Sequence, residues 1–302
     1  MKRVLLTGAT GFVGRHCLPA LLSRGFEVHA VSSQAKPEAC AGVHWHRADL
    51  LKPAEVLEVT RRVEATHLLH LAWYAVPGKF WTSTENVRWV QASLELMQAF
   101  RQAGGSRLVM TGSCAEYDWS YEGYFDEALT PLAPRSLYGV CKNALRMVLE
   151  SYSREAGMSA AWGRIFFLYG AHEPGEKLVA SVIRSLLKEE PARCSHGQQV
   201  RDFLYVEDVA AALVTLLDSE VTGAVNIASG EPVTLSSIIR TIAERLDRPD
   251  LVRMGAIEAQ VDEPPVIVGS NARLEREVGF EPRYNLQAGI DASIDWWRKH
   301  LS

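Results

Sequence analysis

The sequence has few cysteines, no excess of either charge and no long hydrophobic run, and each absence excludes a class of protein. Its five cysteines among 302 residues are odd in number and widely spaced. This argues against a disulfide framework and favours reduced thiols in the cytoplasm. The 32 basic and 36 acidic residues leave a net charge of -4, without the basic excess typical of a protein that binds nucleic acid.

No segment approaches the roughly 18 apolar residues that a membrane span requires. The first apolar stretch is interrupted by Gly8 and Gly11 and has neither the length nor the cleavage site of a signal peptide. We therefore expect a cytoplasmic protein without membrane association. Cys40, His44 and His46 are close in sequence but match no standard zinc spacing, so we predict no metal site.

What the sequence does contain is a regular alternation of apolar strands and helices over its first 170 residues. This alternation predicts an α/β fold with a doubly wound parallel sheet, whose strands are apolar because both faces are buried. The predicted strands are 2–7, 27–31, 43–47, 67–71, 107–111 and 160–168, and the predicted helices are 13–24, 53–64, 85–103 and 136–156.

After residue 170 prolines and glycines punctuate the chain more often. We predict helices at 206–218 and 234–246 and a strand at 225–229. We also predict a smaller C-terminal α/β lobe in this half of the chain. The predicted first domain comprises residues 1–165 plus about 204–229. The predicted second lobe comprises residues 166–203 plus 230–302.

A glycine-rich turn directly follows the first predicted strand and opens the first helix. Its spacing, Gly-x-x-Gly-x-x-Gly, permits a tight turn, close approach of the backbone to a pyrophosphate and close packing of the helix on the strand. The helix N-terminus adds unpaired N–H groups. This context predicts a Rossmann-type dinucleotide site rather than an ordinary turn. The predicted cofactor-binding residues in the turn are Gly8, Thr10, Gly11, Phe12, Val13 and Gly14.

The end of the second predicted strand indicates which cofactor is used. An acidic residue there would accept hydrogen bonds from the ribose 2′-hydroxyl of NAD. This chain has Ser32 and Ser33 instead, with Arg15 and Lys36 nearby in sequence. The serines favour NADP(H), with NAD(H) as the alternative if the two residues only begin a turn.

Asp49 and Leu50 follow the third predicted strand. Asp49 is a candidate for contact with the adenine, and Leu50 lies beside it. The alternative for Asp49 is to cap the N-terminus of the next helix.

Tyr138 and Lys142 lie four residues apart in the helix predicted over 136–156, and therefore on one face of it. An ammonium about 4 Å from a phenol interacts by about 4 kcal/mol at an effective dielectric of 20, which would lower the phenol pKa by about 3 units. Such a phenol could exchange a proton with a carbonyl or hydroxyl near neutral pH. The alternative is a tyrosine on the helix surface with an exposed lysine.

The glycine turn and the segment from Tyr138 to Lys142 together resemble the extended short-chain dehydrogenases/reductases, also called NAD-dependent epimerase/dehydratases. Further segments resemble this family in the same order along nearly the whole chain. They are His70-Leu71-Ala72, Asn86, Thr111 to Tyr117, Pro131 with Pro134, Gly163 to Gly170, and Val200 to Val209.

The resemblance implies roles for individual residues. Ser113 would hydrogen-bond the reacting sugar oxygen, Tyr138 would be the general acid and base, and Lys142 would hold the nicotinamide ribose. Arg201 would bind the diphosphate of a nucleotide sugar, unless it pairs with Asp202 or Glu207. The other implied cofactor contacts are Leu71 and Ala72, and the other implied substrate contacts are Tyr74, Asn86, Cys114, Ala115 and Phe167.

Departures from the family pattern narrow the implied reaction. Family dehydratases carry Asp-Glu after the catalytic Ser or Thr, where this chain has Cys114 and Ala115, so a 4,6-dehydratase is not expected. Phe167 replaces an Asn that often contacts substrate, and Gln260 stands near where epimerases often carry a basic residue. The loop with Trp73, Tyr74, Phe80 and Trp81 either stacks on a sugar or packs between the lobes.

These residues lead to the expectation of an NADPH-dependent reductase. Its substrate would be a nucleotide-diphosphate-linked 4-keto-6-deoxyhexose, with Tyr138 supplying the proton. The first alternative is a nucleotide-sugar 4-epimerase with tightly bound NAD. The second is a non-catalytic sensor that binds NADP and a partner protein.

The helix predicted over 85–103 indicates a homodimer. It is apolar on more than one face and so has more surface to cover than one sheet offers. The resemblance supports this, because family members often dimerise through this helix and the catalytic one. The alternative is a helix covered by loops of its own chain. One stripe comprises Val87, Val90, Leu94, Met97 and Phe100, and Trp89, Leu96 and Ala99 lie off it.

Overall fold

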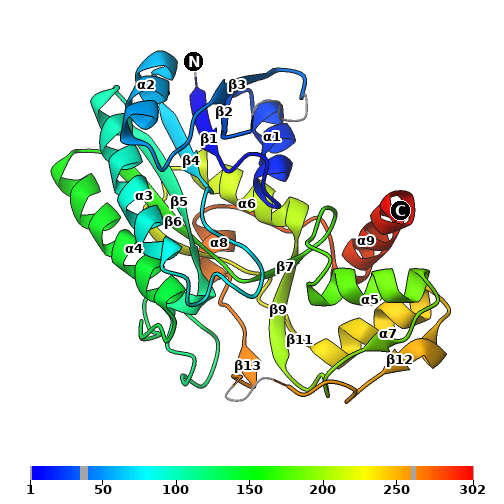
Figure 1. Ribbon diagram of the computed structural model, residues 1–302. Coiled ribbons are helices and arrows are strands. Elements are labelled where there is room, and N and C mark those ends of the chain that lie inside the picture. The colour runs from blue at the N-terminus through cyan, green and yellow to red at the C-terminus, as the bar shows by residue number, and fades with distance from the viewer. Residues whose placement is uncertain (1, 35–39, 260–262, 302) are drawn as a thin grey trace.

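The larger part of the molecule is a seven-stranded parallel sheet, in a computed structural model that describes residues 2–34, 40–259 and 263–301. The strand order is β10-β6-β5-β4-β1-β2-β3 (Figure 1). This confirms the predicted α/β class and the doubly wound sheet. The strands are β1 (Arg3–Thr7), β2 (Glu27–Ser32), β3 (Val43–Arg47), β4 (His67–His70), β5 (Arg107–Ser113), β6 (Ser159–Ile165) and β10 (Gly223–Ile227).

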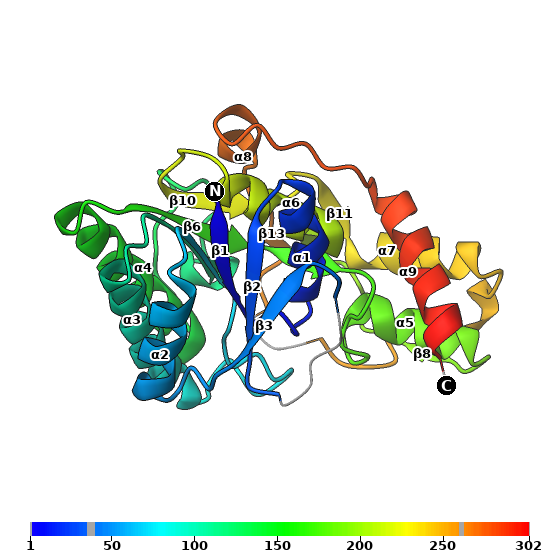
Figure 2. The ribbon, with the colours of Figure 1, turned by 90° about the horizontal axis from the view of Figure 1, so that it is seen from above.

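Helices cover both faces of this sheet, which explains why its strands are apolar on both sides. Val4 and Leu6 pack toward one face and Leu5 toward the other, all with no exposed surface. The first face is covered by α1 (Gly14–Ser23) and α6 (Val206–Leu217). The second is covered by α2 (Pro53–Val63), α3 (Glu85–Gln102) and α4 (Leu137–Glu155), seen together on one side in Figure 2.

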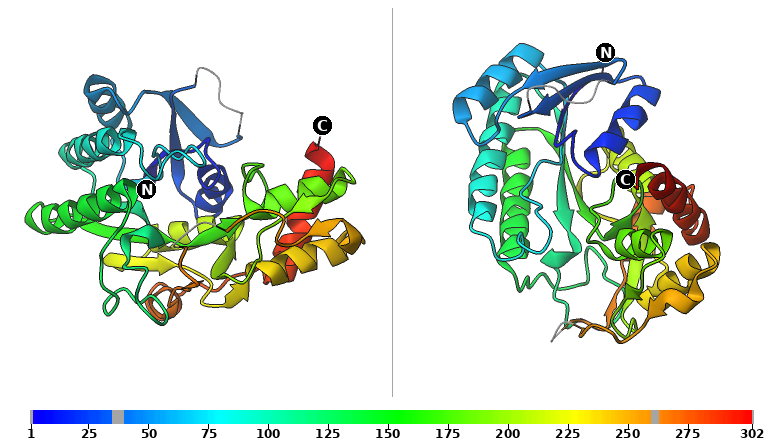
Figure 3. Two further views of the ribbon diagram at one scale, coloured as in Figure 1. Left: turned by 60° about the horizontal axis from the view of Figure 1, so that its bottom comes forward. Right: turned by 45° about the vertical axis from the view of Figure 1, so that its right-hand side comes forward.

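A smaller mixed sheet centres on β9 (Val200–Tyr205). Three helices pack beside it around a separate apolar core, and the C-terminal helix lies along the outer side of this lobe (Figure 3). Its other elements are β7 (Phe167–Tyr169), β11 (Pro232–Thr234), β13 (Val266–Ile267), the pair β8 (Ala192–Arg193) and β12 (Val252–Arg253), and helices α5 (Leu178–Leu187), α7 (Leu235–Arg245) and α9 (Leu286–His300).

The strand predicted over 160–168 is two strands. Ile165 still pairs with Ile227 in the main sheet, whereas Phe167 pairs with Phe203 in the second sheet. Between them, Phe166 is buried against Tyr117 and Phe125. The chain therefore changes sheets at one buried aromatic residue, which carries it from the larger lobe into the smaller one.

Segments from the second half of the chain also pack on the main sheet. Strand β10 lies in this sheet and helix α6 covers one of its faces, and the predicted first domain includes both segments. However, Leu274, Val278 and Phe280, in and after α8 (Ala272–Arg276), pack into the core beside α1 and α6. The prediction placed them in the second lobe, because a five-residue helix gives little periodic signal.

Helix α3 buries part of the apolar stripe named from the sequence together with residues beside it. Met97 and Phe100 of the stripe are buried with Leu96, whereas Val87 is 47% exposed. The helix lies between α2 and α4, so its buried side follows from two neighbouring helices as well as the sheet. Among the described residues, no helix is both long and apolar enough to cross a membrane.

Candidate active site

The turn between β1 and α1 is built by its glycines. Gly8 has a φ of +70°, and its carbonyl accepts a hydrogen bond from the Gly11 N–H at 2.9 Å. A Cβ on Gly14 would lie 2.1 Å from the Gly8 carbonyl oxygen, so only glycine allows the helix to start this close to the strand. Val13 precedes α1, with no side-chain cap and no acidic residue in the first turn. Such an uncapped helix N-terminus fits a pyrophosphate.

The predicted cofactor segment after β4 lies against this turn. A Cβ on Gly8 would meet the Ala72 nitrogen at 2.8 Å and the Leu71 carbonyl carbon at 2.9 Å. The Thr7 hydroxyl accepts hydrogen bonds from the N–H groups of Leu71 and Ala72 at 3.2 and 3.3 Å. The structure therefore brings together the glycine turn and the Leu71-Ala72 backbone, 63 residues apart.

At the end of β2, Ser32 and Arg15 are hydrogen-bonded within the chain, and the exposed Arg47 lies opposite Ser32 in the strand register. Ser32 is buried and its hydroxyl accepts the Gln34 N–H at 3.1 Å, while Ser33 is exposed. The Arg15 guanidinium donates to the Thr10 carbonyl at 3.0 Å and contacts the His172 ring. Lys36 lies outside the described residues.

Asp49 and Leu50 have structural partners. The Asp49 carboxylate accepts the Leu51 N–H at 3.0 Å, and the capping position of α2 is Lys52, so the predicted alternative of Asp49 as that cap is wrong. Leu50 is buried in the core beneath α2 and α3. Leu50 is therefore a core residue that follows β3.

Ser113 and Tyr138 meet at the carboxyl end of the main sheet. Ser113 ends β5, and its hydroxyl accepts the Ala115 N–H at 3.2 Å and lies close enough to the Tyr138 phenol to lower its pKa. Ser136 caps the N-terminus of α4 through the Gly139 N–H at 3.1 Å. A Cβ on Gly139 would lie 2.3 Å from the Ala115 carbonyl oxygen, so this glycine lets α4 approach the end of β5.

Lys142 is 4% exposed and is held from two sides. Its ammonium donates to the Thr111 carbonyl at 2.8 Å and lies 3.7 Å from the centroid of the Trp73 ring. Burial lowers the pKa of Lys142 to about 7. This group therefore carries only part of a full positive charge at neutral pH.

The expectation that Lys142 lowers the Tyr138 pKa is wrong for the protein by itself. Burial raises the pKa of Tyr138 instead, opposed by the nearby Ser113 hydroxyl. The Lys142 ammonium lies 5.9 Å from the Tyr138 ring centroid and faces Trp73. The spacing correctly placed Tyr138 and Lys142 on one helix face. It could not show which ring the Lys142 ammonium contacts.

Aromatic rings surround Tyr138. The rings of Phe80 and Trp81 lie 4.9 and 5.7 Å from it and that of Trp73 lies 6.5 Å away, all edge-to-face. The Trp81 carbonyl also accepts the Tyr138 N–H at 3.1 Å. The aromatic loop therefore packs on α4, within the larger lobe, and this contact tests neither of its two predicted roles. Tyr74 is partly buried in the same loop.

Asn86 organises this loop from below. It has no exposed surface, its Oδ1 accepts the Trp73 indole N–H at 2.8 Å, and its amide donates to the carbonyls of Phe80 and Ser83 at 2.7 and 2.8 Å. All its polar atoms are used within the chain. The expected direct contact of Asn86 with substrate is therefore not supported, because the side chain holds Trp73 in place.

A buried ion pair that the sequence analysis missed supports Ser113. The Glu116 carboxylate accepts the Ser113 N–H at 2.8 Å, the Trp162 indole N–H at 2.9 Å and the Arg164 Nε at 2.9 Å. Arg164 also donates to the Tyr117 hydroxyl at 2.9 Å. Ser113 and Glu116 form a capping box around the short helix Cys114–Glu116, and the Ser-x-x-Glu spacing could have revealed it.

Cys114 and Ala115, expected to contact substrate, are 7% and 4% exposed. Burial raises the pKa of Cys114 to about 12. Neither residue offers an acid or base, which agrees with the exclusion of dehydration based on the sequence.

Arg201 is 2% exposed and carries its own counter-ion. Its guanidinium pairs with Glu263 at 2.7 Å, donates to the Pro265 carbonyl at 3.3 Å and lies 5.4 Å from the Phe167 ring centroid. The alternative partners named from the sequence were Asp202 and Glu207, so the pairing with Glu263 is a correction. It arises because β13 runs beside β9. Gln260 lies outside the described residues.

His70 joins the active-site strands through a buried side chain. Its Nδ1 bonds the Thr7 hydroxyl at 2.7 Å and its Nε2 bonds the Ser93 hydroxyl at 2.8 Å. Burial, with a smaller effect of Lys142, lowers the pKa of His70 to about 3. The ring therefore stays neutral in the folded protein.

Acid is predicted to destabilise the fold through His70. The unfolded chain takes up a proton near pH 6.5 and the folded state does not until about pH 3. The free energy of unfolding should fall across that window by up to about 1.4 kcal/mol per pH unit. Urea unfolding from pH 7 to 5 tests this. His70→Gln should flatten the slope, and the exposed control His196→Gln should not; equal slopes for wild type and His70→Gln would contradict it.

The fold and the site define an α/β protein of the dinucleotide-binding type. Ser113, Tyr138 and Lys142 lie at the carboxyl end of the main sheet, the same end as the glycine turn. The family model "NAD dependent epimerase/dehydratase family" matches residues 4–228. The chain belongs to this family.

Named relatives agree with this membership. UDP-glucuronic acid decarboxylase 1 of Xenopus tropicalis is 25% identical over 311 residues, covering 99% of this chain and 73% of that protein. The dTDP-6-deoxy-L-talose 4-dehydrogenase (NAD(+)) of Aggregatibacter actinomycetemcomitans is 24% identical over 247 residues, 78% of this chain and 87% of that protein. The structure of Thermus thermophilus UDP-glucose 4-epimerase with NAD is 28% identical with a TM-score of 0.86, over 98% of this chain and 99% of that one.

Proposed function

We propose that this protein oxidises and re-reduces the C4 position of a nucleoside-diphosphate hexose with NAD, as a nucleotide-sugar 4-epimerase. The observation that carries the proposal is the position of Tyr138 beside Ser113 and Lys142, with no acid or base at positions 114 and 115. Redox chemistry at one carbon needs only one group that exchanges a proton. Elimination of water needs more, and Cys114 and Ala115 do not supply it.

The family, and the similar structure of Thermus thermophilus UDP-glucose 4-epimerase with NAD, favour NAD over the expected NADP. Ser32 is engaged by its own turn and Arg15 by Thr10, while the exposed Arg47 lies opposite Ser32 in the strand register. The preference for NAD therefore rests on the family and on that similar structure. In this proposal the backbone around Gly8 and Gly14 holds the pyrophosphate, and Leu71 and Ala72 line the path of the cofactor.

The nicotinamide, when bound, accepts and returns a hydride. In the oxidation direction Tyr138 acts as the phenolate and takes the proton of the sugar hydroxyl as it becomes a ketone, and in the reverse direction the resulting phenol returns that proton. The Ser113 hydroxyl donates a hydrogen bond to the same oxygen and orients it. Lys142 holds the cofactor ribose, and its charge makes loss of the Tyr138 proton easier once both face the site.

The first test identifies the cofactor that leaves the purified protein when it is denatured. The second mixes the protein with UDP-glucose and no added cofactor and follows the C4 epimer by proton NMR. We expect released NAD and interconversion of the two sugars. An exposed-site control, Tyr121→Phe, should behave like wild type. Protein that carries no NAD and leaves a panel of UDP- and dTDP-hexoses unchanged would overturn the proposal.

The second candidate is the 4-ketoreductase expected from the sequence. It is favoured by the absence of an acid at Ser32 and Ser33 and by the similarity to the dTDP-6-deoxy-L-talose 4-dehydrogenase. Oxidation of added NADPH or NADH by a dTDP-4-keto-6-deoxyhexose, without epimerisation of UDP-glucose, would favour it. The same panel therefore separates the two candidates.

A homodimer through α3 and α4 remains part of the proposal. Val87 on α3 and Val140, Met147 and Val148 on α4 are each more than 40% exposed. Adjacent exposed apolar residues on two neighbouring helices favour a protein interface. Sedimentation at micromolar protein should give twice the chain mass, and a monomer would contradict this part of the proposal.

A further inference from the structure

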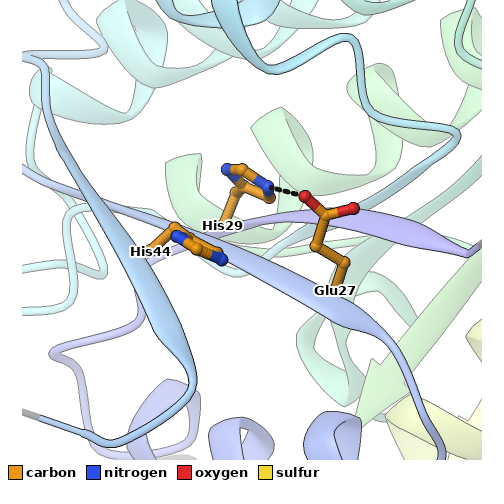
Figure 4. Close-up of side chains that lie close together, drawn as sticks. All are labelled: Glu27, His29 and His44. Atoms are coloured by element: carbon orange, nitrogen blue, oxygen red, sulfur yellow. Dashed lines mark hydrogen bonds and ion pairs between the residues drawn. The ribbon is translucent and has the colours of Figure 1, made fainter.

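Three histidines and a glutamate gather at the edge of the main sheet, away from the active site. Glu27 and His29 are on β2, and His44 and His46 are on β3, the last strand of the sheet. His29 lies opposite His44 in the strand register. Because side chains alternate along a strand, all four face the same side (Figure 4 labels Glu27, His29 and His44).

The donor atoms of three of these residues converge. One ligand atom each from Glu27, His29 and His44 lies within 4.8 Å of the others. The His29 Nε2 and the Glu27 Oε1 are 3.0 Å apart. The His29 and His44 rings are stacked with centroids 4.8 Å apart. Two imidazoles and one carboxylate on rigid strands form the donor set that zinc and related divalent metals use.

His46 completes the arrangement from the far side of His29. Its Nε2 lies 2.8 Å from the His29 Nδ1. A metal-binding histidine commonly donates its other ring N–H to such a partner, which fixes its tautomer. At this distance the His46 ring can hold the His29 ring in one orientation.

Cys40, considered with His44 and His46 from the sequence, does not join the cluster. It packs against the apolar core on the α1 side of the sheet. The cluster in the structure therefore differs from the set rejected on its sequence spacing, because the residues beside His44 come from a different strand.

We propose that Glu27, His29 and His44 bind one divalent transition-metal ion, with His46 as a positioning residue. The metal takes the place of the proton between the His29 Nε2 and the Glu27 Oε1, and that proton leaves to solvent. The Glu27 Oε2 stays bonded to the Arg3 Nε at 3.0 Å. Calcium and magnesium are excluded by the imidazole ligands, since both prefer oxygen.

Affinity should depend on pH and stay moderate. The charged groups facing the cluster from neighbouring elements are Arg3 on β1 and Arg62 on α2. Both oppose a cation, and His44 is exposed. Binding should weaken at acidic pH, because each ligand imidazole must be neutral to bind the metal.

The test uses full-length protein without an affinity tag, stripped with EDTA and dialysed. Zn²⁺ is titrated by calorimetry at pH 7.5, and Co²⁺ is added as a spectroscopic probe of low coordination number. We expect one bound ion per chain, at least about tenfold weaker binding in His44→Gln and Glu27→Gln, and a rise in Tm of wild type with Zn²⁺.

The matched control is His196→Gln, an exposed histidine in the other lobe, which should bind like wild type. Circular dichroism confirms that each variant folds, and His44 is exposed enough for glutamine to replace it. The absence of a bound ion at millimolar Zn²⁺, or equal affinity in wild type and His44→Gln, would overturn the proposal. None of these residues belongs to the active site, so either result leaves the proposed function unchanged.

Discussion

Tyr138→Phe should lower kcat for the nucleotide sugar by about 10²–10⁴-fold, the range typical of losing a general acid or base. The Tyr138 hydroxyl lies beside Ser113, and its ring lies among Trp73, Phe80 and Trp81. Phenylalanine keeps the ring and its packing and removes only the hydroxyl. Turnover followed by NMR or absorbance measures the effect.

Cofactor content separates loss of chemistry from loss of binding. Tyr138→Phe should keep the same amount of bound cofactor as wild type, because the glycine turn lies on a different element. Tyr121→Phe is the control, since the ring of Tyr121 is 36% exposed. A wild-type kcat in Tyr138→Phe would show that Tyr138 is not the general acid or base. Loss of no function in this variant would favour the alternative of a non-catalytic sensor, which keeps its partner binding.

Arg164→Met should destabilise the fold by about 3–5 kcal/mol, the cost typical of removing one partner of a buried ion pair. Arg164 and Glu116 are 1% and 0% exposed, and their Nε and Oε2 atoms are 2.9 Å apart. Without Arg164, the Glu116 carboxylate keeps its bonds to Ser113 and Trp162 but loses its counter-ion. Urea unfolding at pH 7 gives the change in the free energy of unfolding.

The control is Arg298→Met, which removes an exposed pair with Asp295 at 3.3 Å and should cost no more than about 1 kcal/mol. Adding Glu116→Gln to Arg164→Met should recover part of the loss, because the uncompensated buried charge is then gone. Equal destabilisation by Arg164→Met and Arg298→Met would contradict the structural role of the pair. Because Glu116 also accepts the Ser113 N–H, Arg164→Met should lower kcat as well as the free energy of unfolding.

Local sequence patterns predicted the parts of the fold that repeat regularly. Strands β1 to β5 and helices α1 to α4 lie within a few residues of their predicted ranges, because an apolar strand buried on both faces leaves an unbroken signal. Helix α9 was missed, although Ile290, Ile294 and Trp297 repeat at helical spacing and are buried. Nearby prolines outweighed that periodicity in the prediction.

The sequence by itself determined the chemistry of the site: the glycine turn, the serine at the end of a strand, and Tyr138 four residues before Lys142. These depend on spacing within one element, which the chain encodes locally. Only the tertiary structure decided which groups meet across elements. It pairs Arg201 with Glu263, turns Lys142 toward Trp73 and stacks His29 on His44. Such pairs depend on strand order and register. The small number of cysteines and the balanced charge of the chain carry no information about either.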